Sequence, residues 1–398
     1  VEVEWKTLED ITLRTSNIKW REVIRSYRYI DLTSVDIATK KITETTEITK
    51  NNAPSRAQKL VDENDVIFAT TRPTQQRFCL IDSEYAGEVA STGYCILRAK
   101  QDQVLPKWIL HWISTSDFKK HVEENQSGSA YPAISDSKVK ECLIPIPCPD
   151  NPEKSLAIQS EIVRILDKFT ELTAELTAEL SMRKKQYNYY RDQLLSFDEE
   201  QEKPIYQEKL LDGVEVEWLP LSDLARIRNG KDHKSLSEGE FPVYGSGGIM
   251  RYVDTYAYNK PSVLIPRKGS LGNLFFIDVP FWTVDTIFYT EIDEAQIRPK
   301  YLYYFLTTVG LGEMNQAGGV PSQTQSVLNK LKIPIPCPDN PEKSLAIQSE
   351  IVRILDKFDT LTNSITEGLP REIELRQKQY EYYRDLLFSF PKPETISN

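Results

Sequence analysis

The stretch IPIPCPDNPEKSLAIQSEIVRILDKF occurs twice in the chain, letter for letter, at 144–169 and at 333–358. The segments before the two copies share almost no sequence, although an opening motif, VEVEW, also occurs twice, at 1–5 and 214–218. Internal repetition on this scale indicates two copies of one structural unit. Each copy is predicted to contain a short opening strand, a divergent segment, an IPIPCP hinge and a long helix.

A long helix is predicted after each hinge, because apolar residues recur at alternating steps of four and three, as in a coiled-coil seam. In the first copy these are Ile158, Ile162, Ile165, Phe169, Leu172 and Leu176, and in the second Ile347, Ile351, Ile354, Phe358, Leu361 and Ile365. Asn151 and Pro152 are start signals, and the first helix is predicted to continue from about Ser155 to Phe197. The second is interrupted at Pro370 and then resumes. We expect the two helices to pair in antiparallel fashion.

The seam does not explain why Arg164, Asp167 and Lys168, which we expect to face solvent, are also identical in the second copy. A purely structural coiled coil constrains only the apolar positions. A recent duplication would leave the divergent segments alike as well. Two equal surfaces for two copies of one partner account for the identity better.

The two divergent segments are predicted to have mixed α and β character. In the first, strands are expected at 65–73 and 91–99 and a helix at 105–122. In the second, strands are expected at 241–248, 261–270 and 282–292 and a helix at 298–311. This similar order of elements, with little agreement in sequence, indicates one fold with two different working surfaces. The predicted class is α+β.

A net charge of −10 argues against nucleic acid as a partner, but the charge is unevenly spread. Lys and Arg slightly outnumber Asp and Glu in 11–143 and 225–332, so the acidic excess lies in the repeated parts. This weakly favours charge-attracted partners at the divergent segments. The five cysteines form no CxxC pair, which predicts reduced thiols in the cytoplasm. Neither a signal peptide nor a membrane span is expected.

The sequence contains no evident active site. His111, His121 and His233 have no metal-ligand spacing to another His or Cys, and no HExxH, GxSxG or GxxxxGK[ST] motif occurs. GSGG at 245–248 follows a predicted strand, but the residues after it do not begin a helix. A turn is therefore favoured there over a nucleotide-binding loop.

Contact with DNA is better supported, because both divergent segments contain loops rich in Arg, Lys, Asn, Gln and Ser, which read base edges and phosphates. Glycines among them allow close approach of the backbone to a phosphate. In the first segment the candidate DNA-binding residues are Arg56, Lys59, Arg72, Thr74, Gln75, Gln76, Arg77, Ser129 and Tyr131. In the second they are Asn229, Lys231, His233, Lys234, Tyr244, Ser246, Arg267, Lys268, Ser270, Asn273, Gln323 and Gln325.

Each of these loops is by itself more often a plain solvated surface, and only their accumulation in both segments favours DNA. A coiled-coil scaffold that joins two protein partners without touching DNA is the alternative function. An enzyme that acts alone is disfavoured by the missing motifs.

Two divergent segments, each followed by a repeated proline-rich hinge and a heptad helix, resemble the specificity subunit of type I restriction–modification systems. LTAELTAEL at 172–180, the closing motifs at 182–197 and 375–390 and the repeated VEVEW are most similar to the type IC group. The resemblance covers the whole chain. The first VEVEW lacks the EKLLDG that precedes the second at 208–213, which suggests that a short N-terminal piece precedes Val1.

The resemblance implies two similar target recognition domains separated by two long antiparallel coiled-coil helices, in a pseudo-twofold internal repeat. Each domain would read one half of a split site in double-stranded DNA. The expected boundaries are 1–143 and 214–332 for the recognition domains, 144–197 and 333–390 for the hinges with their helices, 198–213 for a linker and 391–398 for a flexible tail.

The resemblance also implies partners. The helices would set the half-site spacing and dock two methyltransferase (M) subunits, which methylate adenine, and restriction/motor (R) subunits would then cut unmodified DNA. No catalytic residue, cofactor or metal is expected in this chain. S-adenosylmethionine, ATP and Mg are expected on the partner subunits. The repeat of Thr-Ala-Glu-Leu at 173–176 and 177–180 suggests that the helix acts as a ruler.

Overall fold

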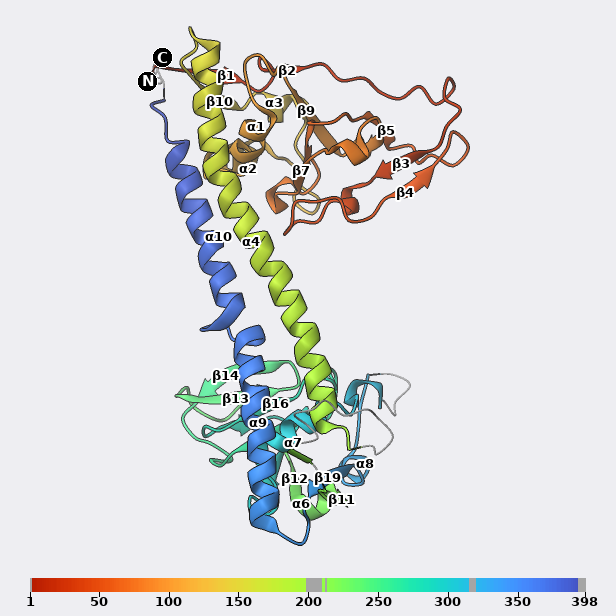
Figure 1. Ribbon diagram of the computed structural model, residues 1–398, viewed down its shortest axis with the longest axis vertical. Helices are drawn as coiled ribbons and strands as arrows, with labels where there is room; N and C mark the ends of the chain where they lie inside the picture. The colour runs from red at the N-terminus through yellow and green to blue at the C-terminus, as the bar shows by residue number, and fades with distance from the viewer. Residues whose placement is uncertain (1, 198–209, 212, 315–319, 393–398) are drawn as a thin grey trace. The chain divides into compact units, whose positions relative to one another are not determined.

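The computed structural model describes residues 2–197, 210–211, 213–314 and 320–392 (Figure 1). Most of the predicted linker and of the predicted tail lies outside these described residues.

The chain divides into two compact units. Unit 1 consists of Val1–Ala178 and Glu372–Asn398, and unit 2 of Glu179–Arg371. Each unit therefore contains one divergent segment, the beginning of one long helix and the end of the other.

The opening motif and the IPIPCP stretch of each copy form a two-stranded antiparallel ribbon. In unit 1, β1 (Val3–Thr7) pairs with β10 (Leu143–Pro147), and in unit 2, β11 (Val216–Pro220) pairs with β19 (Lys332–Pro336). Proline has no amide hydrogen, so within IPIPCP only the two isoleucines and the cysteine can donate, and the Cys148 amide donates to the Glu2 carbonyl (2.8 Å). Ile144 is fully buried. The predicted hinge is therefore a buried strand, and the turn follows it at Cys148, whose φ of 48° is left-handed.

The divergent segment of unit 1 forms two four-stranded sheets. Their strand orders are β2-β9-β6-β7 and β4-β3-β8-β5. The strands are β2 (Thr12–Leu13), β3 (Tyr27–Ile30), β4 (Thr46–Ile48), β5 (Ala57–Leu60), β6 (Val66–Ala69), β7 (Phe78–Leu80), β8 (Val89–Ser91) and β9 (Tyr94–Ala99). The core lies between the first sheet and the helices, where Trp108, Trp112 and Phe118 are buried.

The divergent segment of unit 2 forms matching sheets. The orders β12-β18-β15-β16 and β14-β13-β17 follow those of unit 1, except that among the described residues the second sheet has no counterpart of β5. The strands are β12 (Ala225–Asn229), β13 (Phe241–Gly245), β14 (Gly248–Val253), β15 (Ser262–Pro266), β16 (Phe275–Ile277), β17 (Trp282–Thr283) and β18 (Ile287–Ile292). In both units one strand pair, β3 with β8 and β13 with β17, is parallel. The prediction of one fold for two unlike sequences is confirmed.

Two of the short helices correspond between the units: α1 (Pro106–Trp112) to α7 (Pro299–Leu306), and α3 (Asp136–Lys140) to α8 (Gln325–Leu328). The other two differ in place, because α2 (Ser116–Asn125) follows α1 whereas α6 (Leu221–Leu224) directly follows β11. The single helix predicted at 105–122 is wrong, because Thr115 accepts a hydrogen bond from the Phe118 amide and starts a new helix. Likewise 282–292 is two strands and not one.

The long helices follow the prediction in outline. Figure 1 shows α4 (Pro152–Leu195) as one uninterrupted helix. The second helix is divided into α9 (Pro341–Asn363) and α10 (Gly368–Leu387), with the break before Pro370.

In each unit the two helix parts run antiparallel and stack one aromatic pair. In unit 1 the ring centroids of Phe169 and Tyr383 are 5.5 Å apart, and in unit 2 those of Phe358 and Tyr190 are 5.4 Å apart. These are equivalent residues of the repeats, so the antiparallel pairing was predicted correctly.

Candidate DNA interface

Two loops of unit 1 cross and bring several predicted DNA-binding residues together. Residues 70–77 follow β6, and residues 127–134 precede α3. The Arg72 amide donates to the Pro132 carbonyl (2.7 Å), and the Ile134 amide donates to the Thr70 carbonyl (2.9 Å). We call this pair of loops the crossed loops of unit 1.

Unit 2 has crossed loops of the same construction, made from residues 267–273 after β15 and residues 320–323 before α8. The Gly269 amide donates to the Pro321 carbonyl (2.9 Å), and the Gln323 amide donates to the Arg267 carbonyl (3.0 Å). This register makes Arg72 equivalent to Gly269 and Tyr131 equivalent to Val320. The match cannot be read from the sequence, because only the prolines at 132 and 321 agree in the second loop.

The backbone of the first loop is left-handed at two residues that are not glycine. Arg72 has φ 49° and Gln76 has φ 54°. Side chains from elsewhere in the unit support the loop: Lys40 Nζ donates to the Gln76 carbonyl, and Arg77 donates to the Leu32 carbonyl. Burial lowers the pKa of Lys40 to about 8. Lys40 is therefore part of the site although the sequence analysis did not single it out.

The candidates of unit 1 fall into two groups. Arg56, Arg72, Gln75, Ser129 and Tyr131 are exposed, and Thr74 is half-buried. Lys59, Gln76 and Arg77 instead support the fold.

Lys59 illustrates the second group, because its ammonium donates to the Tyr94 carbonyl (2.6 Å) and pairs with Asp136. Its positive charge is already neutralised inside the unit.

The candidates of unit 2 divide in the same way. The exposed ones are Asn229, Lys231, Lys234, Lys268, Ser270 and Asn273. The half-buried ones are His233, Ser246, Arg267 and Gln325, and the buried ones are Tyr244 and Gln323.

Hydrogen bonds connect several of these loops. Asn273 Nδ2 donates to the Ser246 carbonyl (3.2 Å), and Gln325 Nε2 donates to Asn229 Oδ1 (3.3 Å). The loops after β13 and β15 therefore meet each other, and the end of β12 meets the short helix α8. Gln323 is used internally, since its Nε2 donates to the Pro266 carbonyl (2.6 Å).

A buried glutamine joins each recognition domain to its long helix. In unit 1, Gln159 Oε1 accepts from the Leu105 amide (2.9 Å) and its Nε2 donates to the Gln103 carbonyl (3.0 Å). Leu105 and its unit 2 equivalent precede α1 and α7, and neither helix start has a side-chain cap of its own. In unit 2, Gln348 makes the same two bonds, to Arg298 and Gln296. We call these contacts the glutamine clasps.

An aspartate about two turns beyond each clasp repeats the arrangement. Asp167 accepts from Lys107 Nζ (2.6 Å) and His111 Nε2 (2.9 Å). Burial raises the pKa of Asp167, but these two hydrogen bonds outweigh it, so its pKa lies below the ordinary value. Asp356 accepts from Lys300 and Tyr304 in the same way. Asp167 was predicted to face solvent, and that expectation is wrong: its identity in both copies serves packing within the unit.

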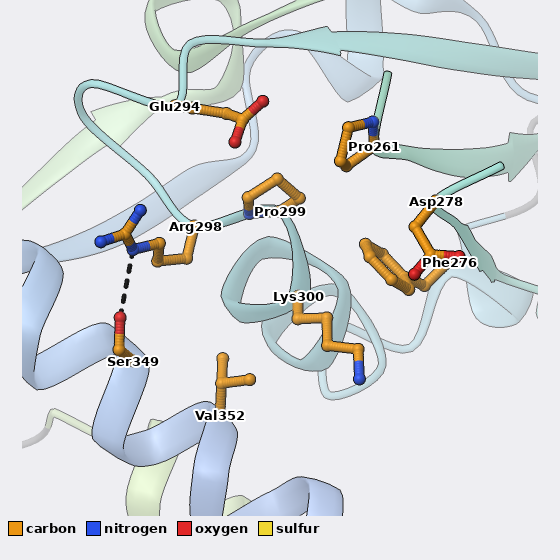
Figure 2. Close-up of a pocket in the computed structure, with 9 residues that line it drawn as sticks. All are labelled: Pro261, Phe276, Asp278, Glu294, Arg298, Pro299, Lys300, Ser349 and Val352. Carbon is orange, nitrogen blue, oxygen red and sulfur yellow. Dashed lines mark hydrogen bonds between the residues drawn. The ribbon is translucent and has the colours of Figure 1, made fainter. Parts of the chain in front are cut away.

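A pocket of about 300 Å³ opens in unit 2 between α7 and α9 (Figure 2). Arg298 faces Ser349 across it, and its Nε donates to Ser349 Oγ (3.1 Å). Lys300 is held by Asp356. These cations therefore help to fix α7 on α9.

Two further findings concern function classes. In the described parts of the chain, no group of three or more His, Cys, Asp and Glu residues could hold a metal ion. Within the same residues, none of the helices has the length and apolar character that crossing a membrane requires.

The profile of the Type I restriction modification DNA specificity domain matches residues 2–182 and 213–375. The type I restriction enzyme EcoR124I/EcoR124II specificity subunit of Escherichia coli is 39% identical, over 100% of this chain and 97% of its own length. The EcoprrI specificity subunit of Escherichia coli is 36% identical, over 78% of this chain and 74% of its own.

Solved structures share the fold. The S subunit of a type I restriction–modification system from M. genitalium aligns with a TM-score of 0.59 at 19% identity, covering 98% of this chain and 97% of that one. A chain from a structure describing complex assembly and conformational transition of the type I R-M system aligns with a TM-score of 0.62 at 20% identity, covering 97% of each. With two matched domains, two crossed-loop surfaces and full-length relatives, the chain belongs to the family of type I restriction–modification DNA specificity subunits.

Proposed function

We propose that each crossed-loop surface reads one half of a bipartite site in double-stranded DNA, and that the long helices set the gap between the halves. The observation that supports this most directly is that one backbone frame carries different side chains at equivalent positions. Arg72 corresponds to Gly269, and Tyr131 corresponds to Val320. The loop backbone is the same in both units while its exposed side chains differ. This suits two domains that recognise different base sequences.

The chemistry of the loops fits base and phosphate contacts. Exposed Arg, Lys, Asn and Gln side chains are the usual donors to base edges and phosphate oxygens. At Gly269 an added side chain would lie 3.2 Å from Ser246 Oγ, at a φ of 84°. Glycine there keeps the backbone open to close approach by a phosphate.

The long helices are proposed to dock two copies of one methyltransferase subunit. Four residues that are both identical and exposed in the two blocks lie on one face of each helix, at steps of three, seven and four. They are Lys154, Ala157, Arg164 and Lys168 in α4, and Lys343, Ala346, Arg353 and Lys357 in α9. Unlike Asp167, these side chains do not pack against a recognition domain. A shared partner is the simplest reason for keeping them equal.

The chemistry would reside in the partners. The methyltransferases would bind S-adenosylmethionine and methylate adenine, and the motor–nuclease subunits would use ATP and Mg. Such a complex would work in the cytoplasm, in keeping with the five free cysteines. Family membership favours this recognition role over a scaffold that does not touch DNA.

The docking proposal is tested by counting subunits. Native mass spectrometry of the chain with its methyltransferase is expected to give two methyltransferases per chain. Arg164→Glu and Arg353→Glu are each expected to remove one copy, and the double variant both. Lys120→Glu, on exposed α2, is the matched control and should change nothing. A wild-type complex with a single methyltransferase would overturn the proposal.

The recognition proposal is tested by mapping methylated adenines in a host that carries this chain and its methyltransferase. A bipartite consensus with a fixed gap is the expected result. Methylation without a consensus would exclude the proposed role of the crossed loops.

A further inference from the structure

Arg72 has a backbone conformation that normally disfavours its side chain. Its φ of 49° lies in the left-handed region, where a residue other than glycine is strained. The surrounding structure holds it there: its amide donates to the Pro132 carbonyl, and the neighbouring Thr71 forms a β-bridge with Ala133. Strain that is maintained in this way at an exposed loop indicates that the direction of the side chain matters.

Tyr131 from the second crossed loop accompanies the guanidinium of Arg72. The Arg72 Cζ lies 5.2 Å from the centroid of the Tyr131 ring. That distance is within the range of a cation–π contact. The Tyr131 side chain is 71% exposed, so the ring is available to orient the guanidinium while the pair stays open to a ligand.

The other cations near this loop are already in use. Arg77 donates to the Leu32 carbonyl, and Lys40 donates to the Gln76 carbonyl. Both bonds hold the loop from the protein side. Within residues 70–77, which the structure describes completely, Arg72 is the one exposed cation.

The equivalent positions of unit 2 carry no such pair, and the guanidinium in that loop, Arg267, is half-buried and lies over the buried Phe288 ring. Gly269 replaces Arg72 and has no side chain, and Val320 replaces Tyr131 and has no ring. The nearest cation of that loop, Lys268, occupies the position of Thr71 and is a point charge without the planar fork of arginine.

On the basis of the proposed function, we infer that Arg72 reads a guanine of the first half-site through its O6 and N7 atoms. Tyr131 is the positioning residue that orients the guanidinium. A planar fork that is held in one orientation matches this pair of acceptors on the major-groove edge. No guanine is read in this way from the equivalent position of unit 2, so there the two halves differ in the kind of contact and not only in sequence.

The test uses the chain with its methyltransferase and duplexes that contain the mapped site. Each guanine of the first half-site is replaced in turn by 7-deazaguanine, which lacks the N7 acceptor. We expect one replacement to weaken binding of the wild-type complex, by less than the roughly 5- to 150-fold of a whole bidentate contact, because the O6 acceptor remains. In the Arg72→Gly complex the same replacement should have no further effect.

Arg72→Gly is the informative variant, because glycine adopts a φ of 49° without strain and reproduces the residue found at 269. It should relax one position of the methylated consensus. Arg72→Lys should do the same despite keeping the charge. Tyr131→Ala should weaken discrimination at that position and Tyr131→Phe should not, since only the ring is required. Lys120→Ala, at an exposed position of α2 outside the crossed loops, is the control and should leave the consensus unchanged.

The outcomes separate the inference from the proposed function. Equal weakening of Arg72→Gly on cognate and scrambled duplexes would make Arg72 a phosphate contact and overturn the inference. Insensitivity of the wild type to every 7-deazaguanine in the first half-site would overturn it too, whatever the variants do. A wild-type complex without any sequence preference would instead refute the proposed function itself.

Discussion

Gln159 and Gln348 are the residues of the repeated block whose identity has the clearest internal reason. Each is fully buried and satisfies an amide and a carbonyl at the start of a recognition-domain helix. Burial of a polar side chain is tolerated only when its hydrogen bonds are made. The two clasps therefore hold different domains on the same helix surface by the same bonds.

Gln159→Leu should destabilise unit 1 by about 1–3 kcal/mol, because the Leu105 amide and the Gln103 carbonyl lose their partner. Hydrogen exchange is the appropriate measurement, since it reports each unit separately. Exchange should increase in 103–112 and stay unchanged in 296–306. Gln348→Leu is the mirror control and should reverse the pattern. Equal changes in both segments would contradict a local clasp.

Lys40 should give unit 1 a pH dependence. Burial, assisted by the nearby charge of Arg77 and opposed by Asp36, lowers its pKa from 10.5 to about 8. Below about pH 8 the folded state carries the full cost of a buried charge. Between about pH 8 and 10.5 the unfolded state binds more protons than the folded state, so the contribution of Lys40 to stability increases with pH.

The thermal midpoint of unit 1 should therefore rise, relative to that of Lys40→Met, between pH 7 and 9.5. Other titrating groups are common to both proteins and cancel in the difference. Exposed Lys41 provides the control through Lys41→Met. A difference that is flat across this range would show that Lys40 is not buried in solution.

At the residue scale the sequence located the right loops but could not rank their side chains. Arg72 and Arg77 look equivalent in ATTRPTQQRF, yet one is exposed and the other donates to Leu32. Lys59 was predicted to contact DNA from its place in a basic loop, but in the folded unit its ammonium pairs with Asp136. These distinctions depend on residues that are distant in the chain, so local composition could not provide them.

At the scale of elements, the heptad pattern correctly predicted the length of α4 but not its most buried positions. Ser155, Gln159 and Leu166 are buried, whereas Leu172 of the predicted seam is 37% exposed. The helix has two neighbours, a recognition domain and the other helix. The polar residues that face the domain leave no apolar signal in the sequence.

The uninterrupted α4 supports the ruler hypothesis for its Thr-Ala-Glu-Leu repeat. A four-residue insertion lengthens a helix by about 6 Å and rotates it by about 40°. One base pair rises about 3.4 Å and turns about 34–36°. Only the rotation is close to that of one base pair.

Inserting one further Thr-Ala-Glu-Leu after Leu180 should lengthen the gap of the methylated consensus by about one base pair and leave both half-sites unchanged. Methylation mapping of the insertion variant measures the gap directly. Replacing residues 177–180 by four alanines keeps the helix length and is the control. A gap that stays the same in the insertion variant would mean that the repeat only fills the helix.

At the scale of the molecule, the repeats in the sequence predicted two similar domains but not how the chain is shared between units. Phe388 lies far from the first recognition domain in sequence, yet it is buried in the core of unit 1 beside Trp108, with ring centroids 4.4 Å apart. Trp5 Nε1 donates to the Pro391 carbonyl (2.7 Å). The closing motif of the second copy thus completes the unit that contains the first recognition domain.

A chain that stops after Arg371 should therefore lose unit 1 rather than unit 2. Limited proteolysis should leave fragments from 179–371 and degrade 1–178. Phe388→Ala should cost unit 1 about 3–5 kcal/mol, as expected for a buried ring. A chain that stops after Lys392 serves as the control. Survival of 1–178 in the shorter chain would contradict the exchange of helix ends.

The unlike side chains at equivalent positions of the crossed loops have a directional consequence. A protein with two identical recognition domains would bind a duplex equally well in both orientations. Arg72 with Tyr131 on one frame, and Gly269 with Val320 on the other, remove that equivalence. The recognition sequence would then be asymmetric, so each site would fix the direction along the duplex in which the bound complex faces.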